Sequence, residues 1–520
     1  MGAGAVANSG TTIAYGHLVD PNRTWRNNKR LIYLNFWILL LLITSSTNGY
    51  DGSMMNGLQS LTQWDDYFGN PRGGKLGLLN AIQNIGSLAA YPFSPYLADG
   101  LGRRTTIFIG AFIMCGATIL QTASQSVGMF IGARFLIGFG LTFAAGAAPM
   151  LVTEISYPVY RAQLTSTYNS LWYSGAIVAA WTTFGSFKIN STWAWRLPSA
   201  LQGLPSVLQV CLIWFVPESP RWLIKKGRNE QALQTLAYYH ADGNEEDPLV
   251  QYEYQEIKAA IELDREVEST IGWKTLFATP GNRRRMRIII ALAFFSQWSG
   301  NGLVSYYLNK VFITIGITNP TIQLLINGIL QIWNLAWALL ASAFVDKVGR
   351  RRLFLCSISG MIIFFTLQTA CSAVYANTKN ESAAHSVIAF IFLYYAAYDI
   401  AFSPLIVSYT VEILPYNIRA KGFTVFNFAI SLSLIFNQYV NPVALEKLQW
   451  KYYLFYVAWL CFEAVFLYFF LVETKNRTLE ETAALFDGEE VAAQLAATAA
   501  QNELREKDDE KSSGSFHEKA

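Results

Sequence analysis

The first long apolar segment of the chain reads LIYLNFWILLLLITSSTNGY from Leu31 to Tyr50 and contains no charged residue. A helix of about twenty residues is about 30 Å long, which is the thickness of the hydrocarbon core of a bilayer. Asp51 follows at once, in the sequence GYDG. A charge within a membrane segment is costly unless it is paired, and such residues usually have a function. The stretch therefore predicts a transmembrane helix with an acid that needs a partner.

The composition of the whole chain is that of a membrane protein. Of 520 residues, 52% are hydrophobic and 14% are charged, whereas soluble proteins carry about 25% charged residues. Twelve apolar segments are long enough to span a bilayer. They cover residues 31–52, 76–97, 106–124, 128–151, 165–187, 198–216, 287–310, 322–345, 353–376, 386–411, 422–441 and 452–472. The net charge of +3 is too small to indicate a nucleic-acid partner.

The residues that usually carry catalysis or bind metal are poorly placed for either role. All five cysteines fall inside apolar segments, none in metal-ligand spacing, and no histidine lies deep in such a segment. No nucleophile–base pair is visible either. We therefore predict no enzyme activity, no metal site and no cofactor.

Five regions follow from this pattern, and the two apolar regions repeat each other. We predict a cytoplasmic N-terminal segment (1–30), a first half of six helices (31–216), a loop with short amphipathic helices (217–286), a second half (287–472) and an acidic cytoplasmic tail (473–520). Three pairs of matching motifs recur in order: DGLGRR (99–104) with DKVGRR (346–351), EISYPVYR (154–161) with EILPYNIR (412–419), and PES (217–219) with VET (472–474). Such a repeat predicts an all-α membrane protein of twelve helices in two halves, the major facilitator fold, with its substrate site between the halves near the bilayer midplane.

The distribution of Lys and Arg predicts the orientation. If successive segments cross the membrane in opposite directions, one side of the membrane holds both termini, the long central loop and Arg103, Arg161, Arg350 and Arg419. Because Lys and Arg gather on the cytoplasmic side, this side is predicted to be the cytoplasm. The sequons at Asn190 and Asn380 then lie outside, where both asparagines are candidate glycosylation sites.

Seven motifs in order resemble the sugar porter family of the major facilitator superfamily. They are GYDG (49–52), DGLGRR (99–104), ARFLIGFG (133–140), PESPRWL (217–223), DKVGRR (346–351), EILPYNIRAKG (412–422) and VETKNRTLEE (472–481). SQWSGNGLVSYYL (296–308) is most similar to the fungal lactose-permease-like branch, which carries mono- and disaccharides. The resemblance implies a plasma-membrane transporter that imports a neutral sugar by proton symport and alternating access.

Asp51 and Arg134 are the predicted proton-coupling pair. The topology puts both at similar depth in the outer half of the membrane, and a guanidinium near a carboxylate favours its ionised form. The resemblance implies the same roles, since proton-coupled members use this aspartate and arginine. The alternative is a static ion pair in a facilitative uniporter. A non-transporting sugar sensor is a further alternative, which the short tail disfavours.

Charged residues at the cytoplasmic helix ends are predicted to form gating networks. They are Asp99, Arg103, Glu154, Arg161 and Glu218 in the first half, and Asp346, Arg350, Glu412, Arg419 and Glu473 in the second. The alternative is that the arginines only anchor helix ends at the membrane surface.

Amide and aromatic side chains are suited to hold the hydroxyl groups of a neutral sugar. The predicted substrate-binding residues are Asn169, Gln297, Asn301, Tyr306 and Asn334. Amides also join membrane helices to one another, which is the alternative reading.

Four departures from the family pattern affect the predicted pocket. Ser296 and Gly302 replace amides, and Val407 and Ser431 replace tryptophans of the family. The wider pocket would suit a disaccharide, or other side chains could refill it around a monosaccharide. Asp399 either contacts substrate, carries a second proton or faces a cavity without a role.

Overall fold

The computed structural model describes residues 26–270, 272–475 and 485–486, and this part of the chain is helical without a β-strand. The first half contains α2 (Lys29–Leu58), α3 (Thr62–Tyr67), α4 (Gly73–Ala90), α5 (Ser94–Leu101), α6 (Arg103–Thr122), α7 (Val127–Ile155), α8 (Pro158–Ser186), α9 (Trp193–Leu201) and α10 (Leu204–Leu212), with a 3₁₀ turn at Ile213–Phe215. The linking region contains α11 (Pro220–Lys225), α12 (Asn229–His240) and α13 (Pro248–Thr270). The second half contains α14 (Thr275–Ala278), α15 (Pro280–Trp298), α16 (Asn301–Thr314), α17 (Pro320–Val348), α18 (Arg350–Thr378), α19 (Glu381–Ala401), α20 (Leu405–Ile413), α21 (Tyr416–Leu448) and α22 (Lys451–Phe470).

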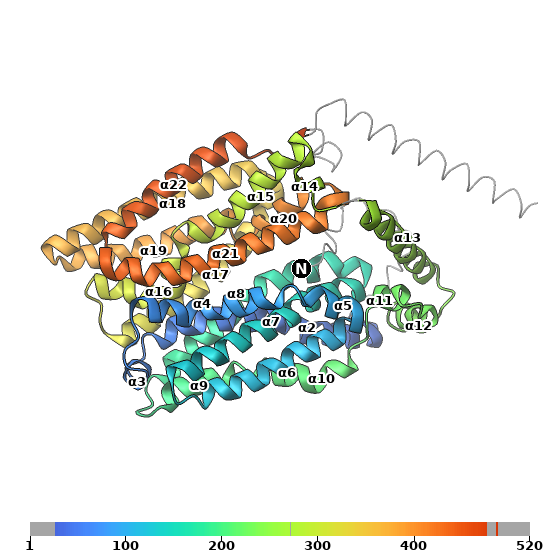
Figure 1. Cartoon of the computed structure of the whole chain (residues 1–520), viewed down its shortest axis with the longest axis horizontal. Helices are drawn as coiled ribbons and strands as arrows, with labels where there is room; N and C mark the ends of the chain where they lie inside the picture. The colour runs from blue at the N-terminus through green and yellow to red at the C-terminus, as the bar shows by residue number, and fades with distance from the viewer. Residues whose placement is uncertain (1–25, 271, 476–484, 487–520) are drawn as a thin grey trace, which may run out of the picture.

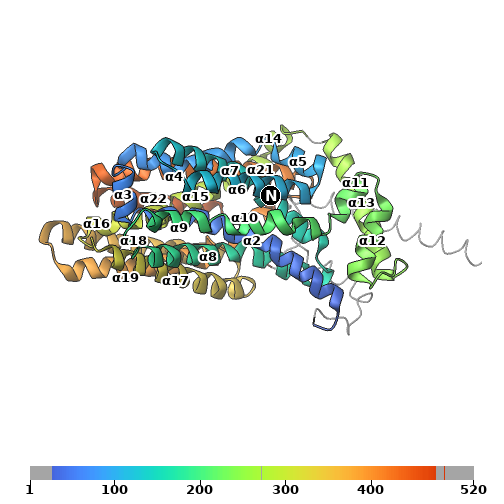
Figure 2. The same ribbon diagram turned by 90° about the horizontal axis from the view of Figure 1, so that it is seen from below.

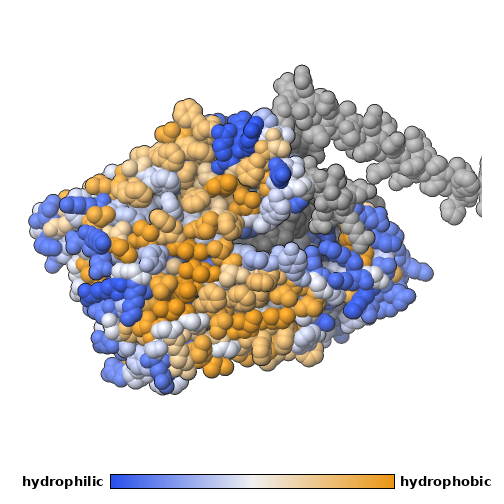
Figure 3. Space-filling view, in the orientation of Figure 1, coloured by the Kyte–Doolittle hydropathy of each residue, from blue (hydrophilic) through white to orange (hydrophobic). Residues whose placement is uncertain are grey.

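The two halves lie side by side with their long helices roughly parallel (Figure 1). Helices α11–α13 lie beyond one end of these long helices, and α3 lies at the opposite end, in both views (Figures 1 and 2). We call the end with α11–α13 the inner end and the end with α3 the outer end. A broad hydrophobic surface lies between two hydrophilic ends (Figure 3), as expected for a protein that spans a bilayer.

Ten helical segments of the described chain are long and apolar enough to cross a membrane. The other two predicted spans, 76–97 and 165–187, are helical as well, in α4–α5 and α8, but they are more polar. Both lie at the junction of the halves, where α4 packs on α21 and α8 packs on α17. Because these helices face protein, they can carry polar residues such as Asn80 and Gln83, both buried.

Glycines allow the helices within the first half to approach one another closely. A Cβ atom at Gly138 of α7 would collide with the carbonyl of Gln83 in α4, and one at Gly86 would collide with that of Phe135. The hydrophobic effect does not bring helices together inside a membrane, so close contacts between small residues stabilise their packing instead. This packing holds α4 against α7 and fixes the positions of Gln83 and Arg134.

Four of the predicted spans are interrupted along their length, one of them being 76–97, which is interrupted between α4 and α5 at residues 91–93. The span predicted as continuous over 287–310 consists of α15 and α16, which are separated at Ser299 and Gly300, and Gly300 adopts a left-handed φ of 97°. The span at 198–216 is broken at Gln202, and span 10 is broken after Ala401, just before the Ser403–Pro404 pair. Breaks of this kind expose backbone and polar side chains where transporters bind their substrates.

Candidate functional site

Asp51 lies inside α2 and is completely buried. Its Oδ1 accepts a hydrogen bond of 2.6 Å from Nε2 of Gln202, at the break between α9 and α10. Its Oδ2 is buried and has no hydrogen-bond partner. The described partner of this carboxylate is thus an uncharged amide. Gain or loss of a proton by Asp51 therefore changes the net charge of this buried pair by one unit.

Arg134 is also buried, but it is held by α4. Its Nε donates to the carbonyl of Leu79, and its Nη2 donates to Oε1 of Gln83, both at 2.8 Å. Its Nη1 is buried without a partner. The structure describes no ion pair within 4.0 Å between Arg134 and Asp51, although the two charges are close enough to interact electrostatically. Asp51 and Arg134 thus have separate hydrogen-bond partners in the structure, and their role as a proton-coupling pair stays a prediction.

A second buried acid joins the two halves near mid-height. Tyr173 of α8 donates a hydrogen bond of 2.7 Å to Oδ1 of Asp399 in α19, and its hydroxyl lies 3.2 Å from Oγ of Ser403. Asp399 is fully buried, and its Oδ2 has no partner. One hydrogen bond between a tyrosine and an acid thus connects the first half to the break in span 10.

Asn301 lies at the start of α16, next to this contact. Its Nδ2 donates to the carbonyl of Ser296 at 3.0 Å and to the hydroxyl of Tyr398 at 3.2 Å. Its Oδ1 is buried and unpartnered. Tyr398 precedes Asp399 in α19, so two unpartnered acceptor oxygens, from Asn301 and Asp399, belong to one polar region. Sugar hydroxyls are the kind of donor that such oxygens accept.

The other predicted sugar ligands occupy different environments. Gln297 is half-buried with Nε2 3.3 Å from Oγ of Ser296, and Asn334 is buried with an unpartnered Oδ1. The backbone carbonyl of Tyr306 accepts a hydrogen bond from Gln59 at the outer end. The side chain of Asn169 lies outside the described residues. At Gly302, a side chain would collide with the amide of Asn437, so α21 fills the space left by the missing amide.

Uncharged amides close the outer end between the halves. We call Asn56, Gln59, Asn309, Gln323 and Asn327 the outer amide cluster. Asn56 of α2 donates to the carbonyl of Val304 and to Oδ1 of Asn327, both at 3.3 Å, and accepts from the backbone of Leu308 at 3.1 Å. Nδ2 of Asn309 donates to the carbonyl of Gln59 at 2.7 Å and to Oε1 of Gln323 at 3.1 Å.

Ion pairs organise the inner end of the first half. Arg103 donates to Asp99 at 3.1 Å and, through two nitrogens, to both oxygens of Glu154 at 3.2 and 3.3 Å. Glu218 accepts from the backbone nitrogens of Arg103 and Arg104 at the start of α6. Burial raises the pKa of Glu218 above its usual range, and these backbone N–H groups oppose that shift. These contacts connect Asp99, Arg103, Glu154 and Glu218, four of the five residues predicted for the first half, and their role in gating stays a prediction.

The second half repeats this arrangement. Arg350 donates to Oε1 of Glu412 at 3.0 Å, and Glu473 accepts from the backbone nitrogens of Arg350 and Arg351 at 2.9 and 3.1 Å. In both halves a glycine with φ of 101°, Gly102 or Gly349, precedes the capped helix. A carboxylate at a helix N-terminus is favourable because it meets free N–H groups and the positive end of the helix dipole. The side chain of Asp346 lies outside the described residues, and Arg419 donates to the carbonyl of Leu414 at 3.2 Å.

Arg161 pairs with a carboxylate of the linking region. Its Nη2 lies 3.2 Å from Oε1 of Glu253 in α13, and the other oxygen of Glu253 lies 2.6 Å from Nδ1 of His240 in α12. Nε2 of His240 faces the carbonyl of Ile155 at 3.3 Å. Because both ring nitrogens face acceptors, only the imidazolium form can donate to both. This buried cluster attaches α12 and α13 to the first half.

Each ion pair that the structure describes joins residues within the first half and the linking region, or within the second half. The described hydrogen bonds between the halves lie instead at the outer end or near mid-height, as in the outer amide cluster and the Tyr173–Asp399 contact. In this conformation the halves are therefore joined on the outer side, and the predicted gating residues at the inner end do not bridge them among the described contacts.

Several of these residues were missed by sequence reasoning. Gln202 and Gln83 are single amides in apolar segments, and His240 and Glu253 lie in a polar region that predicts only surface helices. A weak signal was available for Gln202, because the following Gly203 marks a break in the span. The sequons are exposed at Asn190 and Asn380, and Oδ1 of Asn380 accepts the backbone N–H of Ser382 at the start of α19.

Two repeated halves of long helices, some of them broken along their length, are the arrangement of the major facilitator fold. The family described as "Sugar (and other) transporter" matches residues 37–486, so the chain belongs to this family.

Known relatives support the same assignment. The chain is 29% identical over 463 residues to the MFS-type transporter oryC of Aspergillus oryzae, covering 86% of this chain and 85% of that protein. It is 27% identical over 460 residues to the high-affinity glucose transporter of Kluyveromyces lactis, covering 83% and 81%. The inward-open structure of the xylose transporter XylE from E. coli superposes with a TM-score of 0.72 at 24% identity, covering 87% of this chain and 100% of XylE.

Proposed function

We propose that this transporter imports a neutral sugar together with a proton by alternating access, in the plasma membrane and with both termini in the cytoplasm. The observation that carries the proposal is Asp51, a completely buried carboxylate with an uncharged amide as its described partner and with Arg134 nearby. A site of this kind can exchange a proton without breaking a structural salt bridge. Relatives named as sugar and polyol transporters support the substrate class.

The sugar is proposed to bind between the halves, at the polar region around Asn301 and Asp399. Its hydroxyl groups would donate to the two unpartnered oxygens there. Tyr173 connects this region to the first half, so a bound sugar would contact groups that separate when the halves rock. Gln297 and Asn334, with the undescribed Asn169, are proposed as further ligands.

Proton release is proposed to follow the approach of Arg134. In this structure the guanidinium is bound to Leu79 and Gln83 of α4. If a movement of α7 against α2 within the first half brings Arg134 toward Asp51, the positive charge favours the ionised carboxylate, and moving it away favours proton uptake. The charged networks at the inner ends, whose described ion pairs lie within each half here, would exchange partners during the same motion.

The size of the sugar is also a proposal. The resemblance to the fungal lactose-permease-like branch, together with the loss of two tryptophans at Val407 and Ser431, favours a disaccharide. Asn437 refills part of the space beside Gly302, which would instead suit a monosaccharide. Uptake of labelled glucose, galactose, xylose, arabinose, lactose and cellobiose separates these two readings.

The test measures that uptake in a transport-deficient host at pH 5 and pH 8, with and without a protonophore. Proton symport predicts uptake that is faster at pH 5, is abolished by the protonophore and is lost in Asp51→Asn. Asp66→Asn is the matched control, because it neutralises an exposed acid of α3. Uptake that is indifferent to pH, protonophore and Asp51→Asn would identify a facilitative uniporter. Absence of any sugar uptake by protein at the cell surface would favour a sensor.

A further inference from the structure

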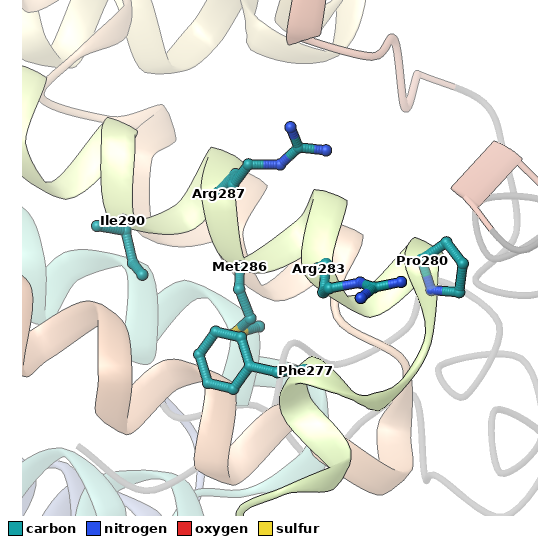
Figure 4. Close-up of a pocket in the computed structure, with 6 residues that line it drawn as sticks. All are labelled: Phe277, Pro280, Arg283, Met286, Arg287 and Ile290. Atoms are coloured by element: carbon teal, nitrogen blue, oxygen red, sulfur yellow. The ribbon is translucent and has the colours of Figure 1, made fainter.

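A groove of about 450 Å³ lies at the inner end of the second half. It is lined by Phe277 of α14 and by Pro280, Arg283, Met286, Arg287 and Ile290 of α15. Figure 4 shows the ring of Phe277 beside Met286, with Arg283 and Arg287 extending from α15 one turn apart. The groove thus combines two cations with an apolar floor.

The four arginines at the start of α15 divide into two pairs. Arg285 is buried, where it donates to the carbonyl of Ile413 at 3.1 Å and to Asn282 at 2.9 Å. The guanidinium groups of Arg284 and Arg285 also lie over the ring of Phe486, at 5.5 and 4.8 Å from its centroid. Arg283 and Arg287 are exposed, and neither forms an ion pair with a carboxylate among the described residues. Two positive charges in the groove are therefore available to an external anion.

The surroundings of the groove are those of a membrane surface. Trp273 is 57% exposed, Phe277 is 50% exposed, and Phe469 at the end of α22 is 70% exposed. The guanidinium of Arg287 lies 5.8 Å from the ring centroid of Phe470, so it is level with the end of that membrane helix. Figure 3 shows a strongly hydrophilic patch over the start of α15, directly beside hydrophobic surface. Exposed aromatic residues at such a border mark the depth of lipid headgroups.

We propose that this groove binds one anionic glycerophospholipid. The phosphate would lie between Arg283 and Arg287, and an acyl chain would cover Phe277 and Ile290. Charge complementarity selects the anionic headgroup, and the apolar lining selects a lipid over a soluble phosphate. Basic pockets between membrane helices commonly bind anionic headgroups in this way. Because α15 is the first helix of the second half, a bound lipid would hold the inner end of that half at a fixed depth in the bilayer.

Native mass spectrometry of the full-length protein, released from nanodiscs with equal phosphatidylserine and phosphatidylcholine, tests the proposal. The double variant R283Q/R287Q is expected to lose one retained phosphatidylserine per protein, with about 30-fold weaker binding, because each basic residue at a membrane surface contributes about 1 kcal/mol. Retention of phosphatidylcholine stays the same. The R283K/R287K variant keeps both charges and is expected to keep most of the binding, which also shows that the position tolerates substitution.

The matched control is K226Q/R228Q, which removes two positive charges from the exposed loop between α11 and α12. It is expected to retain as much phosphatidylserine as the wild type. Equal retention in R283Q/R287Q and wild type would overturn the proposal, as would equal losses in this control. The acidic residues that follow Phe486 in the sequence are the competing occupant. If wild type retains no more phosphatidylserine than R283Q/R287Q while the full-length variant D487N/E489Q/E490Q does, the tail occupies the groove in the wild type and the proposal is wrong.

Discussion

The outer and inner ends of this transporter are built from different chemistry. At the outer end, uncharged amides such as Asn56 and Asn309 join the two halves directly. At the inner end, arginines and carboxylates are connected within each half, as in Arg103–Glu154 and Arg350–Glu412. A hydrogen bond between neutral groups contributes only about 1 kcal/mol, whereas breaking a buried ion pair costs several. Among the described contacts, those that join the halves at the outer end are therefore weak, and those within each half at the inner end are strong.

Arg103→Gln is expected to give the largest effect of the changes considered. It leaves two carboxylates, Asp99 and Glu154, without their shared cation at a site where Arg103 is only 6% exposed. Loss of one partner from a buried ion pair lowers the free energy of unfolding by about 3–5 kcal/mol. Thermal unfolding in detergent, followed by tryptophan fluorescence, measures this loss. Lys75→Gln, which removes an exposed cation near the outer end, serves as the control. Equal losses in the two variants would contradict the claim that the ion pairs at the inner end are the strong contacts.

Glu253→Gln tests whether α12 and α13 belong to the inner network of the first half. The amide leaves Arg161 and His240 without the negative charge that they share. Hydrogen bonds to charged groups contribute about 1.5–3 kcal/mol, so we expect a loss of about 2 kcal/mol in the same unfolding measurement. Glu262→Gln in the same helix is exposed and should change little. Faster proteolysis of the linking region in Glu253→Gln would show that the helices detach, and unchanged stability and proteolysis would refute the role.

Asn56→Ala tests the outer amide cluster. It removes three hydrogen bonds that join α2 to α16 and α17, at a net cost of about 1–2 kcal/mol. The population that is open on the outer side should rise by about tenfold, with little change in unfolding. Pulsed electron resonance distances between spin labels at Lys188 and Glu381, with exposed native cysteines replaced, report this opening. A distance distribution identical to that of the parent would exclude the cluster as a gate, and Asn70→Ala is an exposed control.

Lys225→Gln should have the smallest effect. Lys225 pairs with Asp99 at 3.3 Å, but the two side chains are 40% and 51% exposed. Exposed ion pairs contribute about 0.2–1 kcal/mol, and salt screens them. We expect the free energy of unfolding to fall by less than about 0.5 kcal/mol, and we expect this difference to disappear at high salt. A loss as large as that of Arg103→Gln would show that burial is not what separates strong from weak contacts at the inner end.

Much of the inner end was predictable from sequence. The paired motifs around Arg103 and Arg350 recur at nearly constant separation, and their charges must gather where six-helix halves end at the membrane surface. The same repeat predicted that Glu218 and Glu473 have equivalent positions, and each caps the start of an earlier helix of its half, α6 or α18. Arg161 is the exception, because its partner Glu253 lies in a region with no counterpart in the second half.

The outer end and the buried acids were less predictable. Amides such as Asn56 and Gln202 occur singly in apolar segments, where a sequence does not distinguish a gate, a ligand and an ordinary contact between helices. The role of Asp51 and Arg134 as a proton-coupling pair stays a prediction, since the structure gives each residue a separate hydrogen-bond partner.

By itself, the sequence determined the class of this protein: hydrophobic length fixes membrane helices, the repeat fixes two halves, and the motifs indicate the family. These features depend on local composition and order along the chain. Only the tertiary structure decided which side joins the halves, that Gln202 binds Asp51, and that Tyr173 reaches Asp399. The physical reason is that a polar group in a membrane must find its partner on another helix, and the choice among many such groups depends on how the helices pack.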